Sequence, residues 1–150
     1  MQFHGRANDK TTLDWAWVDD QLRAAGTYWV DARSPGQPHP RPVWGVWRTE
    51  RLHLSIGTPA TLRALALDPV LTVHLDSGTE VVIVEGRATA SESDPDVIVA
   101  YNEKYDWSYD VAKYGPLVSV EPSAILAWRT EGWAGRGSFR ETGRWLYSVE

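Results

Sequence analysis

Between residues 27 and 90 the sequence contains several short runs in which apolar and polar residues alternate, and turn-forming residues separate most of these runs. A period of two over about four to eight residues is typical of a half-buried β-strand. Similar runs recur near the end of the chain. The predicted strands are residues 28–33, 42–48, 52–56, 70–75, 80–90, 118–121, 124–130 and 145–149. The chain is therefore predicted to fold mainly as antiparallel sheet.

A few short helices are predicted between the strands. The predicted helices are residues 12–25, 60–67 and 95–105. The second has the clearest start signal, because Thr58 can cap it and Pro59 suits its first position. Strands and helices do not alternate regularly, which favours a small antiparallel barrel over a parallel, doubly wound sheet.

The length and charge of the chain limit the classes of protein to which it can belong. A chain of 150 residues can bury a core of its own, so we expect a flexible N-terminal tail at residues 1–10 and a single domain at 11–150. The net charge is −5 and no basic stripe is present, which argues against binding nucleic acid or a membrane surface. No apolar run is long enough to span a membrane, and the polar start lacks a signal-peptide pattern. We therefore expect a cytoplasmic protein.

The sequence nominates no catalytic or metal-binding residue. Cysteine is absent, which excludes thiolate zinc sites and cysteine nucleophiles. The four histidines (His4, His39, His53 and His74) lack metal-ligand spacing and acidic companions. No Gly-x-Ser-x-Gly motif marks a serine nucleophile, and no spacing among the acidic residues singles out a catalytic pair.

One segment has a weak phosphate-binding pattern. Ser55-Ile56-Gly57-Thr58-Pro59 leads from a predicted strand into a predicted helix. The backbone N–H groups at a helix N-terminus attract anions, and Thr61 and Arg63 could add a hydroxyl and a guanidinium. The same residues also suit an ordinary helix cap.

A second segment, Arg41 to Trp47, is rich in aromatic residues, in a chain that holds nine tryptophans. Its alternation places Trp44 and Trp47 on opposite faces of the strand. A planar heterocycle needs an apolar wall and backbone groups to read its edge, and this strand offers both. Tryptophans that pack in a barrel core or a dimer seam would give the same pattern.

Taken in order, these segments resemble the flavin-binding split-barrel family related to pyridoxamine-phosphate oxidase, from about Leu13 to Tyr147. The matching pieces are residues 29–33, 35–39, 41–44, 54–58, 62–69, 81–87 with Val84-Glu85-Gly86, 101–105, 127–128 and 143–145. The resemblance implies a mostly β fold, a split barrel of six to eight antiparallel strands with a few short helices. It also implies a homodimer with two cofactor sites at the subunit interface. The cofactor would be FMN or the deazaflavin coenzyme F-420, and the Val-Glu-Gly strand and late Arg-Trp pair are more similar to the deazaflavin branch.

The resemblance also implies which residues bind the cofactor. By position, residues 41–44 would line the ring, 55–58 would reach the ring edge and ribityl chain, Thr61 and Arg63 would face the phosphate, and residues 144–145 would close the site. The implied set is Arg41, Pro42, Val43, Trp44, Ser55, Ile56, Gly57, Thr58, Thr61, Arg63, Arg144 and Trp145.

The chain departs from the family pattern at Thr61, where relatives usually carry a lysine, and at Ala64, where they often carry an asparagine. Losing a charge-assisted contact to the phosphate costs about 1.5–3 kcal/mol, or roughly one to two decades in affinity. We therefore expect weaker cofactor binding than in a relative that has the lysine.

The leading hypothesis is an oxidoreductase that transfers hydride between the bound cofactor and a small substrate. Hydride chemistry resides in the cofactor, which explains why no acid–base constellation is visible. Two alternatives remain open. One is a non-catalytic split-barrel protein that binds a flavin, haem or another aromatic ligand, and the other is a cofactorless dimer in which Trp44 and Trp47 fill the seam.

Overall fold

The computed structural model describes residues 5–89, 94–130 and 141–148. Within these residues the chain forms a sheet of nine strand segments, in which all paired strands are antiparallel. The strands are β1 (Arg6–Ala7), β2 (Tyr28–Ala32), β3 (Arg41–Val43), β4 (Gly45–Arg48), β5 (Arg51–Leu54), β6 (Val70–His74), β7 (Glu80–Thr89), β8 (Val118–Arg129) and β9 (Glu141–Leu146).

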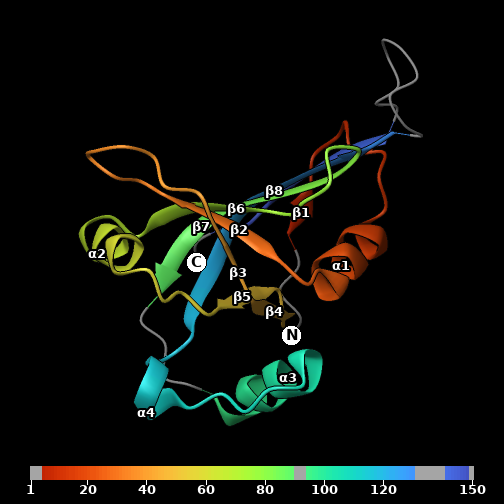
Figure 1. The fold of residues 1–150 in the computed structure, drawn as a ribbon. Coiled ribbons are helices and arrows are strands. Elements are labelled where there is room, and N and C mark those ends of the chain that lie inside the picture. The colour runs from red at the N-terminus through yellow and green to blue at the C-terminus, as the bar shows by residue number, and fades with distance from the viewer. Residues whose placement is uncertain (1–4, 90–93, 131–140, 149–150) are drawn as a thin grey trace.

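The sheet closes into a barrel and also splits (Figure 1). The order β8-β7-β6-β2-β3 continues through β4, which pairs with β5, and β5 pairs back onto β8. The long strand β8 is shared between two partners on its second edge. Residues 118–120 pair with β5, and residues 124–129 pair with β9. The sheet therefore divides along β8 into a closed barrel and a wing made of β9 and β1.

A β-bulge lies at the point of division. The register between β7 and β8 shifts between Glu85 and Gly86, and Gly86 lies opposite Pro122. A Cβ atom on Gly86 would lie 2.5 Å from the carbonyl oxygen of Glu121, so the backbones of the two strands come too close for any side chain there. Bulges bend strands and increase their twist, which lets β7 and β8 serve both the barrel and the wing.

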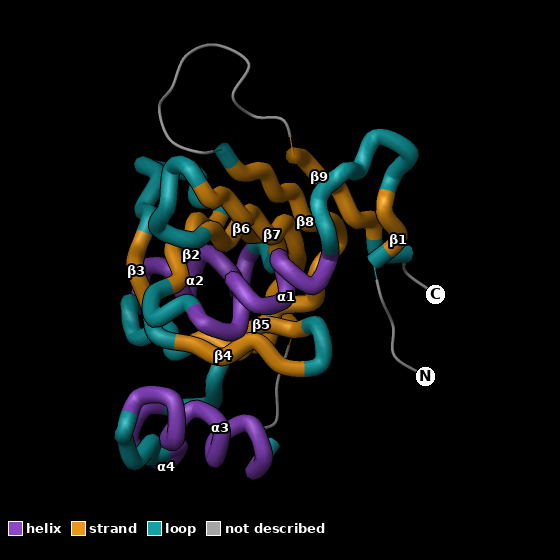
Figure 2. Tube along the Cα trace, turned by 90° about the vertical axis from the view of Figure 1, so that its right-hand side faces the viewer, coloured by secondary structure: helices purple, strands orange, loops and turns teal. Residues whose placement is uncertain are grey.

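In the part of the chain that the structure describes, four helices flank the barrel (Figure 2): α1 (Trp15–Ala24), α2 (Pro59–Leu67), α3 (Pro95–Tyr105) and α4 (Val111–Tyr114). The side chain of Asp14 accepts a hydrogen bond from the N–H of Ala16 and caps α1, and Asp94 and Asp110 cap α3 and α4 in the same way. Helix α3 lies beside β4, and both α3 and α4 lie outside the barrel. No helix in the described part of the chain is long and apolar enough to cross a membrane.

The main core fills the barrel and the space under α1. Its largest fully buried side chains are Tyr28, Leu22, Leu52, Leu54, Leu71, Ile125, Val18, Val30, Val73, Val82, Val84 and Val120. A second, smaller cluster of Val46, Val97, Tyr101 and Leu117 attaches α3 to the outer side of β4. The barrel and the α3–α4 segment therefore have separate apolar contacts.

The predicted strands and helices are confirmed in type and order, with differences at their ends. The helix predicted from residue 12 begins at Trp15, because Asp14 is its cap. The strands predicted at 118–121 and 124–130 are one strand, β8, which passes Pro122 without ending. The last strand begins at Glu141, earlier than expected, and Val149 lies outside the described residues.

Two features were not expected from the pattern. Arg6 and Ala7, assigned to the tail, pair with Leu146 and Trp145 at the free edge of β9. The short helix α4 follows Asp110, whose carboxylate accepts hydrogen bonds from the N–H groups of Ala112 and Lys113. Residues 1–4 of the expected tail lie outside the described residues.

Candidate functional site

The strand predicted at 42–48 changes partners at Trp44. Residues 41–43 pair with β2 as β3, and residues 45–48 pair with β5 as β4. The carbonyl oxygen of Trp44 accepts a hydrogen bond from the N–H of Ser55 at 2.9 Å. The structure therefore places the expected ring-lining segment, 41–44, directly beside the expected ring-edge segment, 55–58.

The side chains of these two segments point in different directions. Pro42 and Trp44 are exposed, whereas Arg41 and Val43 are partly buried. In the second segment Ile56 is buried in the barrel core, Gly57 is exposed and Ser55 and Thr58 are partly buried. A Cβ atom on Gly57 would have no neighbour within 4 Å, so the strand-to-helix turn borders open space.

The N-terminus of α2 has no side-chain cap. Thr58 occupies the cap position but its side chain makes no capping hydrogen bond, and Pro59 takes the first turn. The N–H of Leu62 bonds to the carbonyl of Thr58 and begins the helical ladder. Backbone N–H groups in such an uncapped first turn favour an anion.

Thr61 and Arg63 do not share a face of α2. Thr61 is 4% exposed, and its hydroxyl has no hydrogen-bond partner among the described residues, whereas Arg63 is exposed. Residues two positions apart in the sequence lie about 200° apart around a helix, so Thr61 and Arg63 point to nearly opposite sides of α2. The only guanidinium that α2 offers to the solvent is therefore that of Arg63, and the hydroxyl of Thr61 lies beneath the helix.

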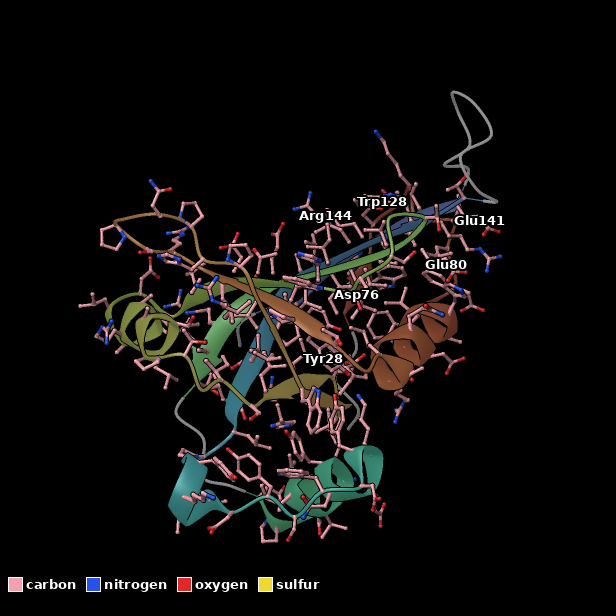
Figure 3. All side chains as sticks on the ribbon, in the orientation of Figure 1. Tyr28, Asp76, Glu80, Trp128, Glu141 and Arg144 are labelled. Atoms are coloured by element: carbon pink, nitrogen blue, oxygen red, sulfur yellow. The ribbon has the colours of Figure 1, made fainter. Side chains whose placement is uncertain are left out.

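Arg144 and Trp145 lie on β9, far from the other expected site residues. Arg144 is exposed, and Figure 3 shows it near Trp128 at the wing of the sheet, away from Tyr28. Trp145 is 3% exposed and packs edge-to-face on Trp15, with ring centroids 5.2 Å apart. In the strand order β9 and β3 are separated by four strands, so one chain does not bring these residues to Arg41.

A cross-strand row runs over the outer face of the sheet between these two regions. Its members, which pair in succession, are Pro42, Trp29, His74, Ile83, Leu126 and Arg144. The rings of Trp29 and His74 are parallel, 6.2 Å apart, and the indole N–H of Trp29 donates to Asp76. We call these six residues the outer row. Its four middle members are partly buried and mostly apolar, and none of them belongs to either core cluster.

The structure adds Lys104, which the sequence did not nominate. This residue of α3 is partly buried, and its Nζ donates to the hydroxyl of Tyr28 and to the carbonyl of Gly45, both at 2.9 Å. The ammonium also lies 4.8 Å from the centroid of the Tyr28 ring. Burial lowers the pKa of Lys104 to about 8. No ion pair with a carboxylate is recorded for Lys104 among the described residues.

The low pKa of Lys104 gives the protein a testable pH dependence. Between pH 8 and the ordinary lysine pKa of 10.5 the unfolded chain binds this proton more tightly than the folded protein, so the free energy of unfolding is expected to rise with pH. Burial raises the pKa of Tyr28 and of Tyr105, so the folded protein holds these phenol protons more tightly than the unfolded chain and neither phenol can cause a rise in stability with pH. Denaturant unfolding at about pH 7.5 and about pH 9.5 measures the rise, which Lys104→Met should abolish. An equal rise in the variant would assign the effect to another group.

The histidines of the described strands make structural contacts. His53 Nδ1 lies 2.9 Å from the hydroxyl of Ser119, its cross-strand neighbour, and burial lowers the pKa of His53. His74 Nδ1 lies 2.9 Å from the carbonyl oxygen of Leu75. Within residues 5–89, 94–130 and 141–148, no group of three or more histidine and acidic side chains is arranged to hold a metal ion.

A closed antiparallel barrel that splits along one long strand defines the split-barrel class of fold. No protein-family model matches the chain, and no curated protein matches it in sequence. Solved structures match its fold. A candidate pyridoxamine 5'-phosphate oxidase from Listeria innocua gives a TM-score of 0.58 at 19% identity, covering 73% of this chain and 97% of that one.

Two further solved structures are of proteins whose names include a cofactor. An F-420 reductase gives a TM-score of 0.56 at 19% identity, covering 71% of this chain and 94% of its own. An FAD binding protein from Mycobacterium smegmatis gives 0.55 at 16% identity, covering 91% and 99%. The chain therefore has the split-barrel fold that these solved structures share, among them a pyridoxamine 5'-phosphate oxidase-like protein, an F-420 reductase and an FAD binding protein, as the sequence resemblance predicted.

Proposed function

We propose that this protein is a homodimeric oxidoreductase that binds a flavin-type cofactor, with the deazaflavin coenzyme F-420 favoured over FMN. The observation that carries the proposal is the contact between the two cofactor segments. The main chains of Trp44 and Ser55 are joined by a hydrogen bond, next to the uncapped start of α2. The partly apolar segment 41–44 and an anion-binding helix end thus lie side by side, which suits a cofactor with a planar ring and a phosphate.

The phosphate end of the site would be held by α2. The N–H groups of its first turn and the Thr58 hydroxyl are free of capping bonds, and the Arg63 guanidinium is exposed on the same helix. The buried hydroxyl of Thr61 contributes no charge where a family lysine would, so Arg63 would supply the only positive side chain from this helix. This supports the expectation of weak binding.

The ring end would be completed by a second copy of the chain. Arg144 lies at the far end of the outer row from Pro42, so it can reach the ring only across a two-fold interface. The partly buried middle of the outer row, with Trp29, Ile83 and Leu126, supplies apolar surface for such an interface. Trp145 would support Arg144 from the core rather than touch the cofactor.

The bound cofactor would supply the hydride chemistry. The residues of the chain would orient it: β3 and the main chain of Trp44 beside the ring, Ser55 and Gly57 near its edge, and the start of α2 at the phosphate. The apolar surroundings would exclude water from the ring face.

Titration of the purified protein with FMN and with coenzyme F-420, followed by tryptophan fluorescence, tests the proposal. Saturable quenching by one of them is expected, and Arg63→Ala should weaken it roughly ten- to hundredfold because a charge-assisted contact is lost. Arg48→Ala removes another exposed arginine, on β4, and should leave binding unchanged.

Thr61→Val distinguishes a structural role of Thr61 beneath α2 from the role in phosphate binding that the sequence resemblance implied. The variant removes a buried hydroxyl without a partner, so the melting temperature should rise while cofactor affinity stays the same. Flat titration curves for both cofactors would reject the proposed function. Binding without turnover of the reduced cofactor over a substrate screen would instead favour the non-catalytic binding protein.

A further inference from the structure

Two large indole rings stand exposed at right angles beside the proposed cofactor site. Trp44 is 44% exposed and Trp107 is 50% exposed. Their ring centroids are 6.0 Å apart and their planes meet at 86°. Exposed aromatic surface of this size is unfavourable in water unless a ligand or a partner covers it. We call this pair the aromatic recess.

The recess is held rigidly from behind. The ring of Tyr105 stacks on Trp44 with centroids 4.5 Å apart and planes 2° apart, so one face of Trp44 is occupied. The Tyr105 hydroxyl donates to the carbonyl of Gly26 at 3.0 Å and accepts from the N–H of Gly45 at 2.9 Å. Lys104 bonds to the carbonyl of Gly45 from the same end of α3. These contacts fix the end of α3 to the strand that carries Trp44.

The second wall is positioned by the end of α3. Asp106 adopts a left-handed conformation with φ 49°, and the N–H of Trp107 bonds back to the carbonyl of Asn102 at 3.1 Å. Aspartate tolerates this conformation better than most residues, and it ends the helix abruptly. The turn directs the chain so that the rings of Trp107 and Trp44 meet edge to face.

We propose that the aromatic recess binds a planar aromatic molecule, the second reactant of the site, between the open face of Trp44 and the ring of Trp107. A flat ring can stack on Trp44 while its edge meets Trp107, which are the two arrangements that aromatic pairs prefer. No acceptor is recorded for either indole N–H among the described residues, so a ring carbonyl on the ligand has donors available. The position rests on the proposed function, because the main chain of Trp44 borders the cofactor segment 55–58.

The test uses 2-quinolinone, a planar bicyclic ring with a carbonyl group, and its saturated, non-planar analogue octahydro-2-quinolinone. The indole N–H signals of the dimer are followed by NMR, with Trp44→Phe and Trp107→Phe assigning the two signals. The planar probe should shift both signals together and leave that of buried Trp47 unchanged. The saturated analogue should shift neither.

Trp107→Ala should weaken binding of the planar probe roughly tenfold, because one aromatic wall is lost, and leave cofactor affinity unchanged. Tyr114→Ala, which removes another exposed aromatic ring from the same segment, is the matched control and should have no effect. Because Trp107 lies at the surface, thermal unfolding of the variant is expected to match that of the natural protein.

Three results would overturn the proposal. If the planar probe shifts neither signal, the recess binds no such ring. If Trp107→Ala weakens cofactor binding instead, the recess holds the cofactor ring itself. If the variant dissociates the dimer, a second subunit covers the recess. Failure of the proposed function is distinguishable, because the probe would then still bind while neither cofactor did.

Discussion

Replacing Tyr28 with alanine is expected to destabilise the folded protein by about 3–5 kcal/mol, a large part of the roughly 5–15 kcal/mol typical of a domain. The ring is 0% exposed in the barrel core. Its hydroxyl donates to the carbonyl of Leu22 at 2.6 Å and accepts from Lys104 at 2.9 Å. The substitution therefore leaves a cavity, an unpaired carbonyl at Leu22 and a partly buried ammonium that has lost one acceptor and the neighbouring ring.

Equilibrium denaturant unfolding measures this effect, and Tyr28→Phe divides it. Phenylalanine keeps the ring under Lys104 and removes only the hydroxyl, so we expect a loss of about 1–3 kcal/mol. Equal losses for the two variants would mean that the hydroxyl network, and not ring packing, carries the contribution of Tyr28.

Gly86→Ala is expected to cost about 1–3 kcal/mol or more, because the added Cβ would lie 2.5 Å from the Glu121 carbonyl oxygen and 3.0 Å from Val120. The nearest atom belongs to the backbone of β8, so the two strands must move apart at the bulge. The shift would pass to β5 and β9, which pair with β8 on either side of Pro122.

Gly26→Ala is the matched control, because a Cβ there meets nothing within 4 Å. Alanine at such a position is expected to raise stability slightly, by about 0.4–1 kcal/mol, by restricting the unfolded chain. Urea midpoints and m-values for both variants test the pair. A Gly86→Ala protein as stable as the natural one would show that the bulge can open freely.

The fold could be predicted from sequence because its signals are local. The alternation in residues 28–33 and the helix-start pattern Thr58-Pro59 each depend on a few neighbours, and β2 and α2 lie where these patterns place them, although the Thr58 side chain makes no capping bond. The contacts that close the barrel join residues far apart in the sequence. Nothing between residues 118 and 129 indicates that β8 exchanges β5 for β9, because that division depends on a bulge in another strand.

The candidate site was predictable in its segments and less so in its side chains. The adjacency of residues 41–44 and 55–58 follows from the hairpin that joins β4 and β5. The burial of Thr61 could have been read from helical spacing, since it is three and four residues before buried Ala64 and Leu65. Lys104 and Trp107 reach the site only through the packing of α3 on β4, which no periodicity in the sequence encodes.

The segment from Arg41 to Arg48 connects two parts of the barrel. Its first half pairs with β2 and its second half pairs with β5. Trp44 lies at the junction between the two halves, and the strands of the barrel would separate most easily there. A ligand bound at this junction would hold the two halves together. Its binding would therefore slow the exchange of amide protons in β2 and in β5, strands that the ligand does not contact.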